Sequence, residues 1–410
     1  MTNVRDSDRS YPRIRFNGYS DAWQKRELKE ISEKVTQKNI ENNFTEVFTN
    51  SAEYGIISQR DFFDKDIANV KNLKTYYVVQ PDNFVYNPRI SNSAPVGPIK
   101  RNKLVRTGVM SPLYYIFIIH DIDANFLEYF FSNTAWHHFM ELNGDTGARS
   151  DRFAIKDSIF CKMPVIQPSK LEQTQIGTLF QSLDNLITVN QRKVEKYQTL
   201  KKALLQRMFV SGGSDIPQIR FNGYSEAWQK RKLGSFTETY SGGTPSAGNS
   251  KYYGGDIPFI RSAEINLDKT KLYLTEAGLN NSSAKLVTVG DILYAMYGAT
   301  SGEVGVSRIN GAINQAILAI KPTQNDDPQF IMQWLRNQKE HIVNIYLQGG
   351  QGNLSGTIVK KLEIETPVKN SEELKIGTIF QKFDNLITVN QRKVETYKEL
   401  KKALLQQMFV

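Results

Sequence analysis

Cysteine and long hydrophobic runs are nearly absent from this sequence, and both absences narrow its class. Cys161 is the single cysteine, so the chain can form neither an intrachain disulfide nor a cysteine-based zinc site. The longest apolar run, Leu113–Ile119, has seven residues, and its Tyr, Phe and Ile content predicts a buried strand. A membrane-spanning helix needs ~20 such residues. The opening MTNVRDSDRS lacks the apolar core of a signal peptide, so we expect a cytoplasmic protein without membrane association.

Sequence motifs for nucleotide binding and for DNA chemistry are missing as well. Neither GxxxxGK(S/T) nor GxGxxG occurs, so no signature of a phosphate-binding loop is present. An adenine methyltransferase would need an (N/D)PP(Y/F) motif to hold a flipped base, and the closest match is NPR at residues 87–89. Three acid-x-lysine tripeptides resemble fragments of a nuclease site, but we expect helical, basic contexts and no such role for them: Glu27–Lys29, Glu373–Lys375 and Glu399–Lys401.

The histidines do not suggest a metal site. There are four, and two of them, His137 and His138, are adjacent, so on a helix they face different ways and make a poor chelate. His120 precedes Asp121 and Asp123, and this group is better explained as polar residues at the end of a strand. We therefore predict no catalytic residue, no metal and no cofactor in this chain.

The charge balance is basic. Lys and Arg number 52 against 42 Asp and Glu, which gives a net charge of +10, while the hydrophobic fraction of 40% is ordinary for a globular protein. This excess favours a polyanionic partner, nucleic acid first, because Lys and Arg neutralise phosphates. A merely basic soluble protein would show the same balance.

The most informative feature is a two-fold internal repeat. Residues 11–28 recur as 216–233 with 14 of 18 positions identical, and residues 175–210 recur as 375–410 with 28 of 36 identical. The intervening segments, roughly 29–165 and 234–365, show no comparable likeness. We call them head one and head two. Each half of the chain is therefore predicted to be a variable domain bracketed by shared segments, as a domain duplication produces.

The second shared segment has the periodicity of a long amphipathic helix. Apolar residues recur at steps of three and four, and no Gly or Pro occurs between Thr178 and Val210. About thirty-five helical residues would span roughly 50 Å. We expect Asn190 and Asn390 in the apolar seam, where a buried polar residue can fix the register. The predicted seam consists of Leu183, Ile187, Asn190, Val194, Tyr197 and Leu204 in the first copy and Phe383, Ile387, Asn390, Val394, Tyr397 and Leu404 in the second.

A helix this long and this polar is stable only if its apolar stripe packs against the apolar stripe of another element. The near-identity of the two seams favours antiparallel packing of the two copies, with a pseudo-two-fold axis and Val410 near the N-terminus. The alternative is two unconnected amphipathic helices, each covering its own domain. The predicted domains are a first variable domain with its N-terminal box (1–167), a central helical region (168–210), a Ser/Gly linker (211–215), a second variable domain (216–367) and a C-terminal helical region (368–410).

Duplication with divergence of the heads alone favours DNA reading. Duplex DNA is itself pseudo-symmetric, so a two-fold symmetric protein can place two reading heads on one face at a fixed separation. Shared segments would then supply two identical docking surfaces, and unlike heads would recognise two different sequences.

Both heads contain residues suited to DNA contacts. In head one, four basic residues and no acid fall within positions 100–106, on a predicted loop or hairpin after a Pro/Gly-rich turn at 94–98. They could grip phosphates or read guanine, although a solvated charged face is the commoner explanation. In head two, GGTP at 242–245 predicts a tight turn. The candidate contacts are Arg60, Arg89, Lys100, Arg101, Lys103 and Arg106 in head one, and Thr244, Lys251, Arg261 and Ser262 in head two.

Several segments resemble the specificity subunits of Type I restriction–modification systems. They are SGGTPS at 241–246, YYGGDIPFIRSAEI at 252–265, YGATSGEVGV at 297–306, NQAILAIKP at 314–322, and LKKALLQ(R/Q)MF at 200–209 and 400–409. Head one lacks the GGTP signature and resembles a different class of recognition domain. The resemblance implies an α+β fold in which two DNA target-recognition domains are joined by two long helices, which form an antiparallel coiled coil with pseudo-two-fold symmetry.

The resemblance also implies a function without chemistry in this chain. Each head would read one half of an asymmetric, bipartite site in double-stranded DNA, and the helices would act as a ruler for the gap. Two methyltransferase subunits would methylate adenine N6 with S-adenosylmethionine, and two motor-nuclease subunits would use ATP and Mg to translocate and cleave DNA. Truncation of residues 375–410 should then weaken methyltransferase docking more than it alters recognition by an isolated head.

Two alternative functions can be considered for the same sequence. A fused enzyme or stand-alone nuclease would need the motifs that are missing. A coiled-coil scaffold whose modules never touch DNA is compatible with the repeat, but the basic loops and the divergent heads argue against it.

Overall fold

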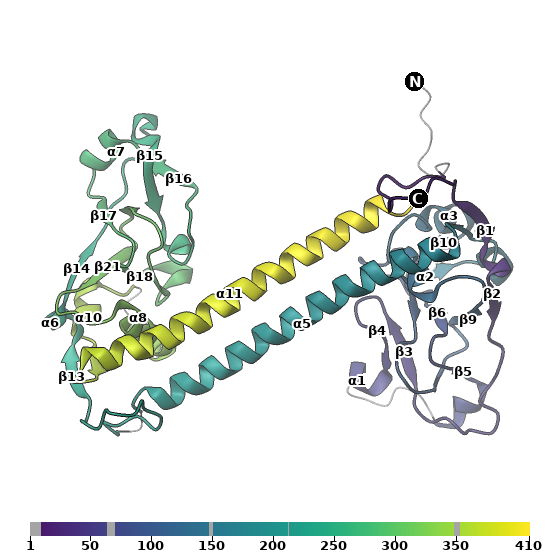
Figure 1. Cartoon of the computed structure of the whole chain (residues 1–410), viewed down its shortest axis with the longest axis horizontal. Coiled ribbons are helices and arrows are strands. Elements are labelled where there is room, and N and C mark those ends of the chain that lie inside the picture. Colours follow the sequence, from purple (N-terminus) through teal and green to yellow (C-terminus); the bar gives the residue numbers. More distant parts are fainter. Residues whose placement is uncertain (1–9, 64–69, 147–150, 212, 348–352) are drawn as a thin grey trace. The chain divides into compact units, whose positions relative to one another are not determined.

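A computed structural model describes residues 10–63, 70–146, 151–211, 213–347 and 353–410. The chain divides into two compact units: the first comprises Met1–Asn190 and Lys393–Val410, and the second comprises Gln191–Arg392. Two long helices, α5 (Lys170–Met208) and α11 (Asn370–Gln407), are each divided between these units (Figure 1). The predicted long helices are present, and α5 begins several residues before Thr178 and includes Gly177. One residue of the predicted linker, residue 212, lies outside the described residues.

The first unit is built on a four-stranded antiparallel sheet in the order β2-β9-β6-β7. The apolar run predicted to be a buried strand forms β9 at an interior position of this sheet, and Ile116 and Phe117 are buried. Leu113 precedes the strand, and both Leu113 and Ile118 are exposed, so the strand is only partly buried. The strands of this unit are β1 (Gln24–Glu27), β2 (Ser32–Lys34), β3 (Phe48–Ser51), β4 (Gly55–Ser58), β5 (Tyr77–Val79), β6 (Phe84–Tyr86), β7 (Ile99–Arg101), β8 (Gly108–Met110), β9 (Tyr115–Ile119), β10 (Asp145–Thr146), β11 (Phe153–Ala154) and β12 (Pro164–Gln167). Its shorter helices are α1 (Gln59–Phe63), α2 (Ala124–Phe130), α3 (His137–Asn143) and α4 (Asp157–Phe160), with 3-10 turns at Leu28–Glu30 and Val70–Thr75.

The second unit contains two four-stranded sheets, β14-β21-β18-β19 and β16-β15-β20-β17. All their strand pairs are antiparallel except β15 with β20, which run parallel. The strands are β13 (Gln229–Lys232), β14 (Thr237–Ser241), β15 (Tyr253–Ile260), β16 (Leu272–Leu274), β17 (Lys285–Val287), β18 (Ile292–Ala295), β19 (Val304–Val306), β20 (Gly311–Ile313), β21 (Ile317–Pro322) and β22 (Glu363–Thr366). The helices are α6 (Leu233–Phe236), α7 (Glu276–Asn280), α8 (Pro328–Asn337), α9 (Lys339–Leu347) and α10 (Gly356–Lys361), with 3-10 turns at Ser250–Tyr252, Ser262–Glu264 and Gly298–Thr300.

The shared segments form the same frame in each unit. In the first unit the Arg15 guanidinium donates two hydrogen bonds, of 2.7 and 2.8 Å, to the buried carboxylate of Glu172. Arg220 binds Glu372 in the second unit at the same two distances. The strand of each N-terminal box also pairs with the strand that precedes a long helix, β1 with β12 and β13 with β22. The sequence repeat is therefore a repeat of tertiary contacts.

Each unit contains the end of one long helix beside the beginning of the other. In the first unit the Phe180 ring lies 5.8 Å from the Phe409 ring, and Asp184, one turn after Phe180, forms an ion pair with Lys401. The second unit repeats both contacts with the copies exchanged, as Phe380 with Phe209 and Asp384 with Lys201. In each unit the residue numbers rise along one helix in the direction in which they fall along the other, so the two helices run antiparallel there.

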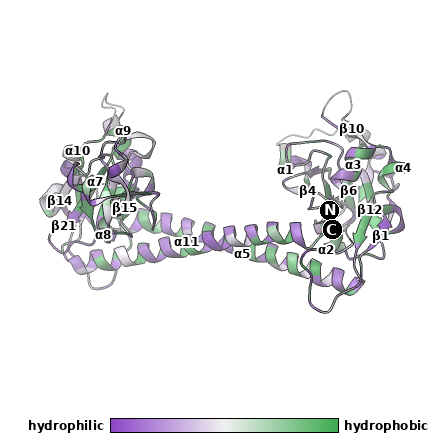
Figure 2. Ribbon diagram, turned by 90° about the horizontal axis from the view of Figure 1, so that it is seen from above, coloured by the Kyte–Doolittle hydropathy of each residue, from purple (hydrophilic) through white to green (hydrophobic). Residues whose placement is uncertain are grey.

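The predicted seam residues are all buried or half-buried. Figure 2 shows hydrophobic and hydrophilic residues interspersed along both long helices, and none of the described helices combines the length and apolar content needed to cross a membrane. The side-chain amide of Asn190 donates to the carbonyl of Leu186, and that of Asn390 donates to the carbonyl of Leu386, each at 2.6 Å. Both seam amides thus satisfy one donor within their own helix.

The unlike heads dock on the long helices through one common device. Asp123 caps the N-terminus of α2 and accepts the N–H of Phe126, and Asp327 caps α8 and accepts the N–H of Phe330. A Cβ on the helical Gly177 would come within 3.0 Å of Asp123, and one on Gly377 within 2.0 Å of Asp327. Glycine at these two positions lets the capped helices approach the backbones of α5 and α11.

Candidate nucleic-acid interface

Of the basic segment at residues 100–106, Lys100 and Arg101 lie on the predicted hairpin, and Lys103 and Arg106 lie in the loop that follows it. β7 pairs with β6 in antiparallel register, and residues 95–96 form part of the preceding turn. Gly97 in this connection has φ +84°, and a Cβ there would lie 2.2 Å from the carbonyl oxygen of Asn87, so only glycine fits. Position on a hairpin was therefore predictable from the turn residues.

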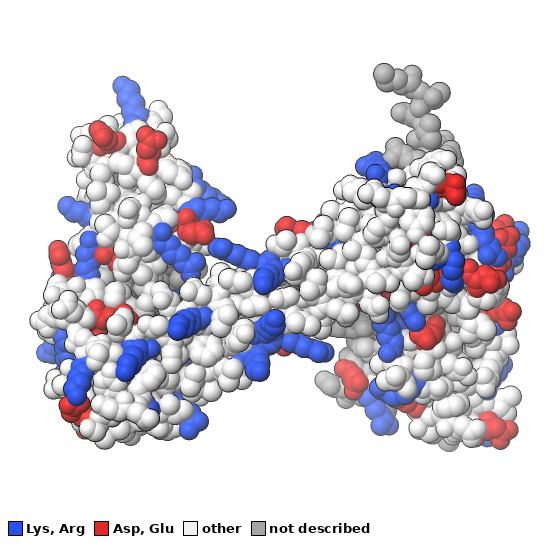
Figure 3. Space-filling view, in the orientation of Figure 1, with Lys and Arg blue, Asp and Glu red and all other residues white. Residues whose placement is uncertain are grey.

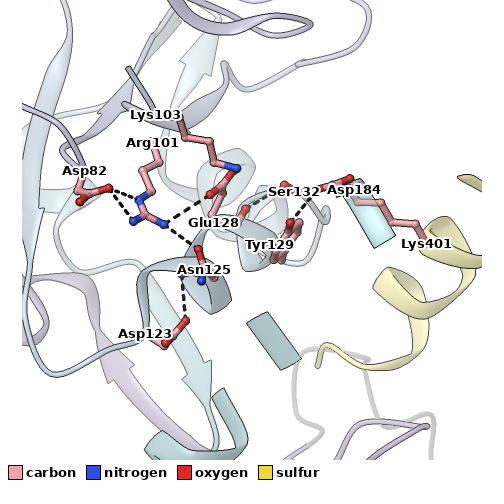
Figure 4. A network of polar contacts seen from close by, with 10 residues as sticks. All are labelled: Asp82, Arg101, Lys103, Asp123, Asn125, Glu128, Tyr129, Ser132, Asp184 and Lys401. Atoms are coloured by element: carbon pink, nitrogen blue, oxygen red, sulfur yellow. Dashed lines mark hydrogen bonds and ion pairs between the residues drawn. The ribbon is translucent and has the colours of Figure 1, made fainter. Parts of the chain in front are cut away.

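Acidic side chains from elsewhere in head one engage the guanidinium of Arg101 (Figure 4). Its Nε and Nη2 donate to Asp82 Oδ1 at 2.9 and 2.6 Å, and its Nη1 donates to Asn125 Oδ1 at 2.9 Å. Glu128 lies 3.8 Å from the same group. The Arg101 side chain is only 15% exposed, and its donors are used within the fold.

The other members of the segment are also engaged. Lys103 forms an ion pair with Glu128 at 2.6 Å, and Arg106 donates two hydrogen bonds to Glu46 at 2.7 and 2.8 Å. Lys100 is half-buried in β7, and its burial lowers its pKa. The sequence around these four candidate DNA contacts has no acid, but the folded head supplies three acidic partners, Asp82, Glu46 and Glu128.

Arg101→Ala is expected to lower the free energy of unfolding of the first unit by about 1 to 3 kcal/mol, because it removes a partner from Asp82, Glu128 and Asn125. The selectivity of DNA binding should stay unchanged. Denaturant unfolding together with DNA-binding titrations would check both parts. Unchanged stability combined with weaker DNA binding would contradict this internal role and support Arg101 as a DNA contact.

Arg89, in contrast, is one of the residues that line a cavity of head one of about 580 Å³. The cavity is lined by β3 and the turn after it, by residues 87–93 and by residues 111–114, and Arg152 also lines it. Arg152 was not singled out from the sequence, because no local motif marks it and its neighbour in the fold is 63 residues away in the chain. Arg60 lies near this region, in α1, and is exposed.

The glycine motif of head two serves close packing. Residues 242–246 form no turn, which corrects the prediction for GGTP. A Cβ on Gly242 would lie 1.9 Å from the Ile313 carbonyl oxygen, and one on Gly243 would lie 2.0 Å from Ser283 Oγ. Thr244 follows directly, is exposed, and donates its hydroxyl to Gln315 Oε1. The motif thus holds Thr244 at the surface beside β20 (Gly311–Ile313).

Arg261, which directly follows strand β15, binds the nearby carboxylate of Glu264. Its guanidinium donates to both carboxylate oxygens of Glu264, at 3.2 and 2.9 Å, and remains partly exposed. Burial alone would raise the pKa of Glu264, but the hydrogen bonds from Arg261, Thr270 and Lys271 lower it to about 2. The Glu264 carboxylate therefore stays charged and holds the Arg261 guanidinium in one orientation.

The two remaining candidates of head two differ in exposure. Ser262 is half-buried at the start of a 3-10 turn. Lys251 is exposed, and no acidic side chain of the described residues forms an ion pair with it.

Basic and acidic side chains are interspersed over both units on the face drawn in Figure 3.

The residues considered for catalysis lie apart. Glu373–Lys375 and Glu399–Lys401 are in α11, as expected. Glu27 ends strand β1 and precedes a 3-10 helix that contains Lys29, so the helical context expected for the first tripeptide is present only in part. His120 follows β9 directly, and His137 and His138 begin α3, as expected. Within the part of the chain that the structure describes, no group of three or more His, Cys, Asp or Glu side chains could hold a metal ion.

The residues through which the two heads pack on α5 and α11 were not identified from the sequence. Asp123 and Phe126 in one head, and Asp327 and Phe330 in the other, form an Asp-x-x-Phe pattern inside segments that otherwise show no likeness. Three residues after each Phe, Tyr129 donates to Asp184 at 2.7 Å and Gln333 donates to Asp384 at 2.6 Å. A search for short patterns at similar distances before the shared helix, 54 residues before Gly177 and 50 before Gly377, could have found them.

Comparisons with known proteins agree with this architecture. Residues 225–398 match the family model described as Type I restriction modification DNA specificity domain. The chain is 25% identical over 191 residues to the Type I restriction enzyme MjaIX specificity subunit of Methanocaldococcus jannaschii, which covers 45% of this chain and 44% of that protein. It is 26% identical over 254 residues to the putative type I restriction enzyme MjaX specificity subunit of the same organism, covering 60% and 57%. The matches thus span about half the length of these curated relatives.

A solved structure resembles the whole chain. The crystal structure of the Type-I restriction-modification system S subunit from M. genitalium aligns with a TM-score of 0.66 at 13% identity, and the alignment covers 98% of this chain and 99% of that one. At this identity the likeness concerns the fold. It confirms the predicted fold class of two α+β domains joined by two long antiparallel helices.

Proposed function

We propose that this chain, whose residues 225–398 belong to the family of Type I restriction modification DNA specificity domains, is the DNA-recognition subunit of such a system. The observation that carries this proposal is the repeated frame: identical contacts hold two unlike heads. Each head reads one half of an asymmetric, bipartite site in double-stranded DNA, and the helices α5 and α11 set the gap between the halves.

This chain recognises the DNA sequence, and its partner subunits catalyse the reactions. Two methyltransferase subunits, which bind S-adenosylmethionine, dock on the shared segments and methylate adenine N6. Two motor-nuclease subunits supply ATP- and Mg-dependent translocation and cleavage. The absence of methyltransferase and phosphate-loop motifs from the sequence supports a non-catalytic role for this chain.

Mapping methylated adenines in the host genome tests the proposal. The wild-type strain should show a split motif with one constant gap, and deletion of the gene for this chain should remove methylation at every copy of the motif. Restoration by the plasmid-borne gene is the control. A methylation map that the deletion leaves unchanged would refute the proposed function.

The gap length should follow the helix length. Seven residues inserted after Asn190 and seven after Asn390 preserve the period of the seam and lengthen each helix by about 10 Å, or about three base pairs of duplex. We expect a longer gap and two unchanged half-sites in the methylation map. An insertion in α5 alone, which mismatches the two seams, is the control and should abolish methylation. A motif with the original gap would contradict the ruler.

A further inference from the structure

Two arginines that line this cavity of head one lie side by side. The N–H of Ile90 donates to the carbonyl of Asp151 at 3.1 Å, and the N–H of Phe153 donates to the carbonyl of Pro88 at 2.7 Å. These two bonds flank Arg89 and Arg152, which are therefore a non-hydrogen-bonded antiparallel pair. In such pairs the Cα atoms are about 4.5 Å apart and both side chains leave on the same face.

Like charges directly opposite one another destabilise a strand pair. The nearest acid, Asp151, lies 4.0 Å from Arg89 and 3.9 Å from Arg152, at the outer limit of an ion pair. Among the described residues, no side chain or carbonyl accepts a hydrogen bond from either guanidinium, and the two side chains are 63% and 42% exposed. The ten N–H donors of this pair thus have no hydrogen-bond acceptor among the described residues, whereas Arg101 and Arg106 donate to acidic side chains of the fold.

The backbone that carries this pair is fixed from the core of the sheet. Asn87 Oδ1 accepts the N–H of Arg89 at 3.0 Å, and the Asn87 amide donates to the carbonyl of Asn50 at 2.8 Å. The Asn50 amide is buried and donates to the carbonyls of Val85 and Pro98. This chain of hydrogen bonds anchors Arg89 to β6, so the backbone has little conformational freedom left to lose when the arginine binds a ligand.

We infer that Arg89 and Arg152 determine the sequence specificity of head one by donating hydrogen bonds to base edges in the DNA groove. The inference rests on the proposed function, and it deepens it by naming the contact. An arginine fork matches guanine O6 and N7, and each such pair discriminates against a wrong base by roughly 10- to 100-fold. The polar side chains of the cavity, Ser91 and Ser93 among them, lie beside the pair and offer hydroxyl groups to neighbouring bases.

The test uses the full chain in complex with the methyltransferase subunits of its host. Duplexes carrying the motif from the methylation map are varied one base pair at a time, and the relative affinity of each is measured. For Arg89→Ala and Arg152→Ala we expect a roughly 10- to 100-fold loss of selectivity at base pairs of one half-site, the same half for both variants, with the other half unchanged. Arg89→Lys keeps the charge but not the fork, so it should lose selectivity as well.

Arg106→Ala is the matched control, because it removes an exposed arginine of head one that Glu46 already binds. It should leave selectivity at every base pair unchanged. The melting temperatures of Arg89→Ala and Arg152→Ala should stay within about 2 °C of the wild type, because neither arginine donates a hydrogen bond within the described fold.

Three results would overturn the inference. They are unchanged selectivity in both alanine variants, a uniform loss of affinity for all sequences that Arg89→Lys restores, and loss of selectivity in both half-sites. The second outcome would indicate phosphate contacts. A wild-type complex without sequence preference would refute the proposed function itself, so the two failures are distinguishable.

Discussion

Phe409→Ala is expected to lower the free energy of unfolding of the first unit by about 3 to 5 kcal/mol and to leave the second unit unchanged. Phe409 is the penultimate residue of the sequence, yet its ring is only 8% exposed. It lies 5.4 Å from the ring of Phe126, 5.8 Å from Phe180 and 6.5 Å from Trp23. Alanine would leave a cavity where these three rings meet.

Native-state hydrogen exchange read by mass spectrometry would localise the effect. In Phe409→Ala, peptides from β6 and β9 should exchange faster, and peptides from β18 and β21 should not. Phe209→Ala is the matched control, because Phe209 makes the equivalent ring contacts with Phe330, Phe380 and Trp228. It should give the reverse pattern. Equal acceleration in both units by either variant would contradict the division into two units.

The same contacts revise the expectation for truncation. Removal of residues 375–410 was expected to affect methyltransferase docking more than recognition by an isolated head. Met408 and Phe409 belong to the hydrophobic core of the first unit, so the truncation should also unfold head one. It cannot separate docking from recognition, and point substitutions on the exposed surface of α11 are the better tool.

Glu373→Gln is expected to stabilise the second unit at pH 8 by roughly 3 to 5 kcal/mol. Glu373 is fully buried, and its Oε2 accepts the N–H of Asp327 at 3.0 Å, while Oε1 has no hydrogen-bond partner in the described part of the chain. Burial raises the pKa of Glu373 to about 8, and the bond from Asp327 offsets this only in part. The first unit has a neutral Gln173 at the equivalent position.

The pH dependence follows from the raised pKa of Glu373. Between about pH 4.5 and 8 the unfolded chain has released this proton and the folded chain has kept it. Stability of the second unit therefore falls as pH rises through this range and levels off above pH 8. Glutamine removes the carboxyl, and its amide can donate a hydrogen bond as Gln173 does to the carbonyl of Pro168. Burial also raises the pKa of Asp327, so a smaller dependence should remain.

Denaturant unfolding between pH 5 and 9 would measure this difference, with hydrogen exchange assigning it to one unit. The reciprocal variant Gln173→Glu is the control: it should introduce the same loss of stability with rising pH into the first unit. If wild type and Glu373→Gln show parallel pH profiles, the buried carboxyl is not protonated near neutral pH and the explanation is wrong.

Predictions that rested on local periodicity and on identity between segments agree with the structure. The apolar run at residues 113–119 predicted a strand, which residues 115–119 form with Ile116 and Phe117 buried, and the three- and four-residue steps after Thr178 predicted a long helix. Periodicity is a property of neighbouring residues, so it survives without knowledge of the fold. Identity between residues 175–210 and 375–410 likewise predicted equal surroundings, which both units show.

The sequence did not show which basic residues have acidic partners, because the partners of charged side chains need not be near them in the chain. Four basic residues without a neighbouring acid look like a free patch, but Asp82, Glu46 and Glu128 approach them in the fold. Conversely, Arg89 has the same residue type and an ordinary sequence context, and it is exposed beside Arg152. Only the pairing of residues 88–90 with 151–153 distinguishes it.

The sequence by itself determined the duplication, the two long helices with their apolar stripes and the divergence of the heads, because each is written in residue order. Tertiary structure alone decided which cations remain available, that Phe409 completes the core of the first unit, and that Glu373 is buried without a full set of partners. Each of these depends on groups brought together from positions far apart in the chain, where Coulomb attraction, ring packing and desolvation act over a few ångströms of space regardless of the residues between them.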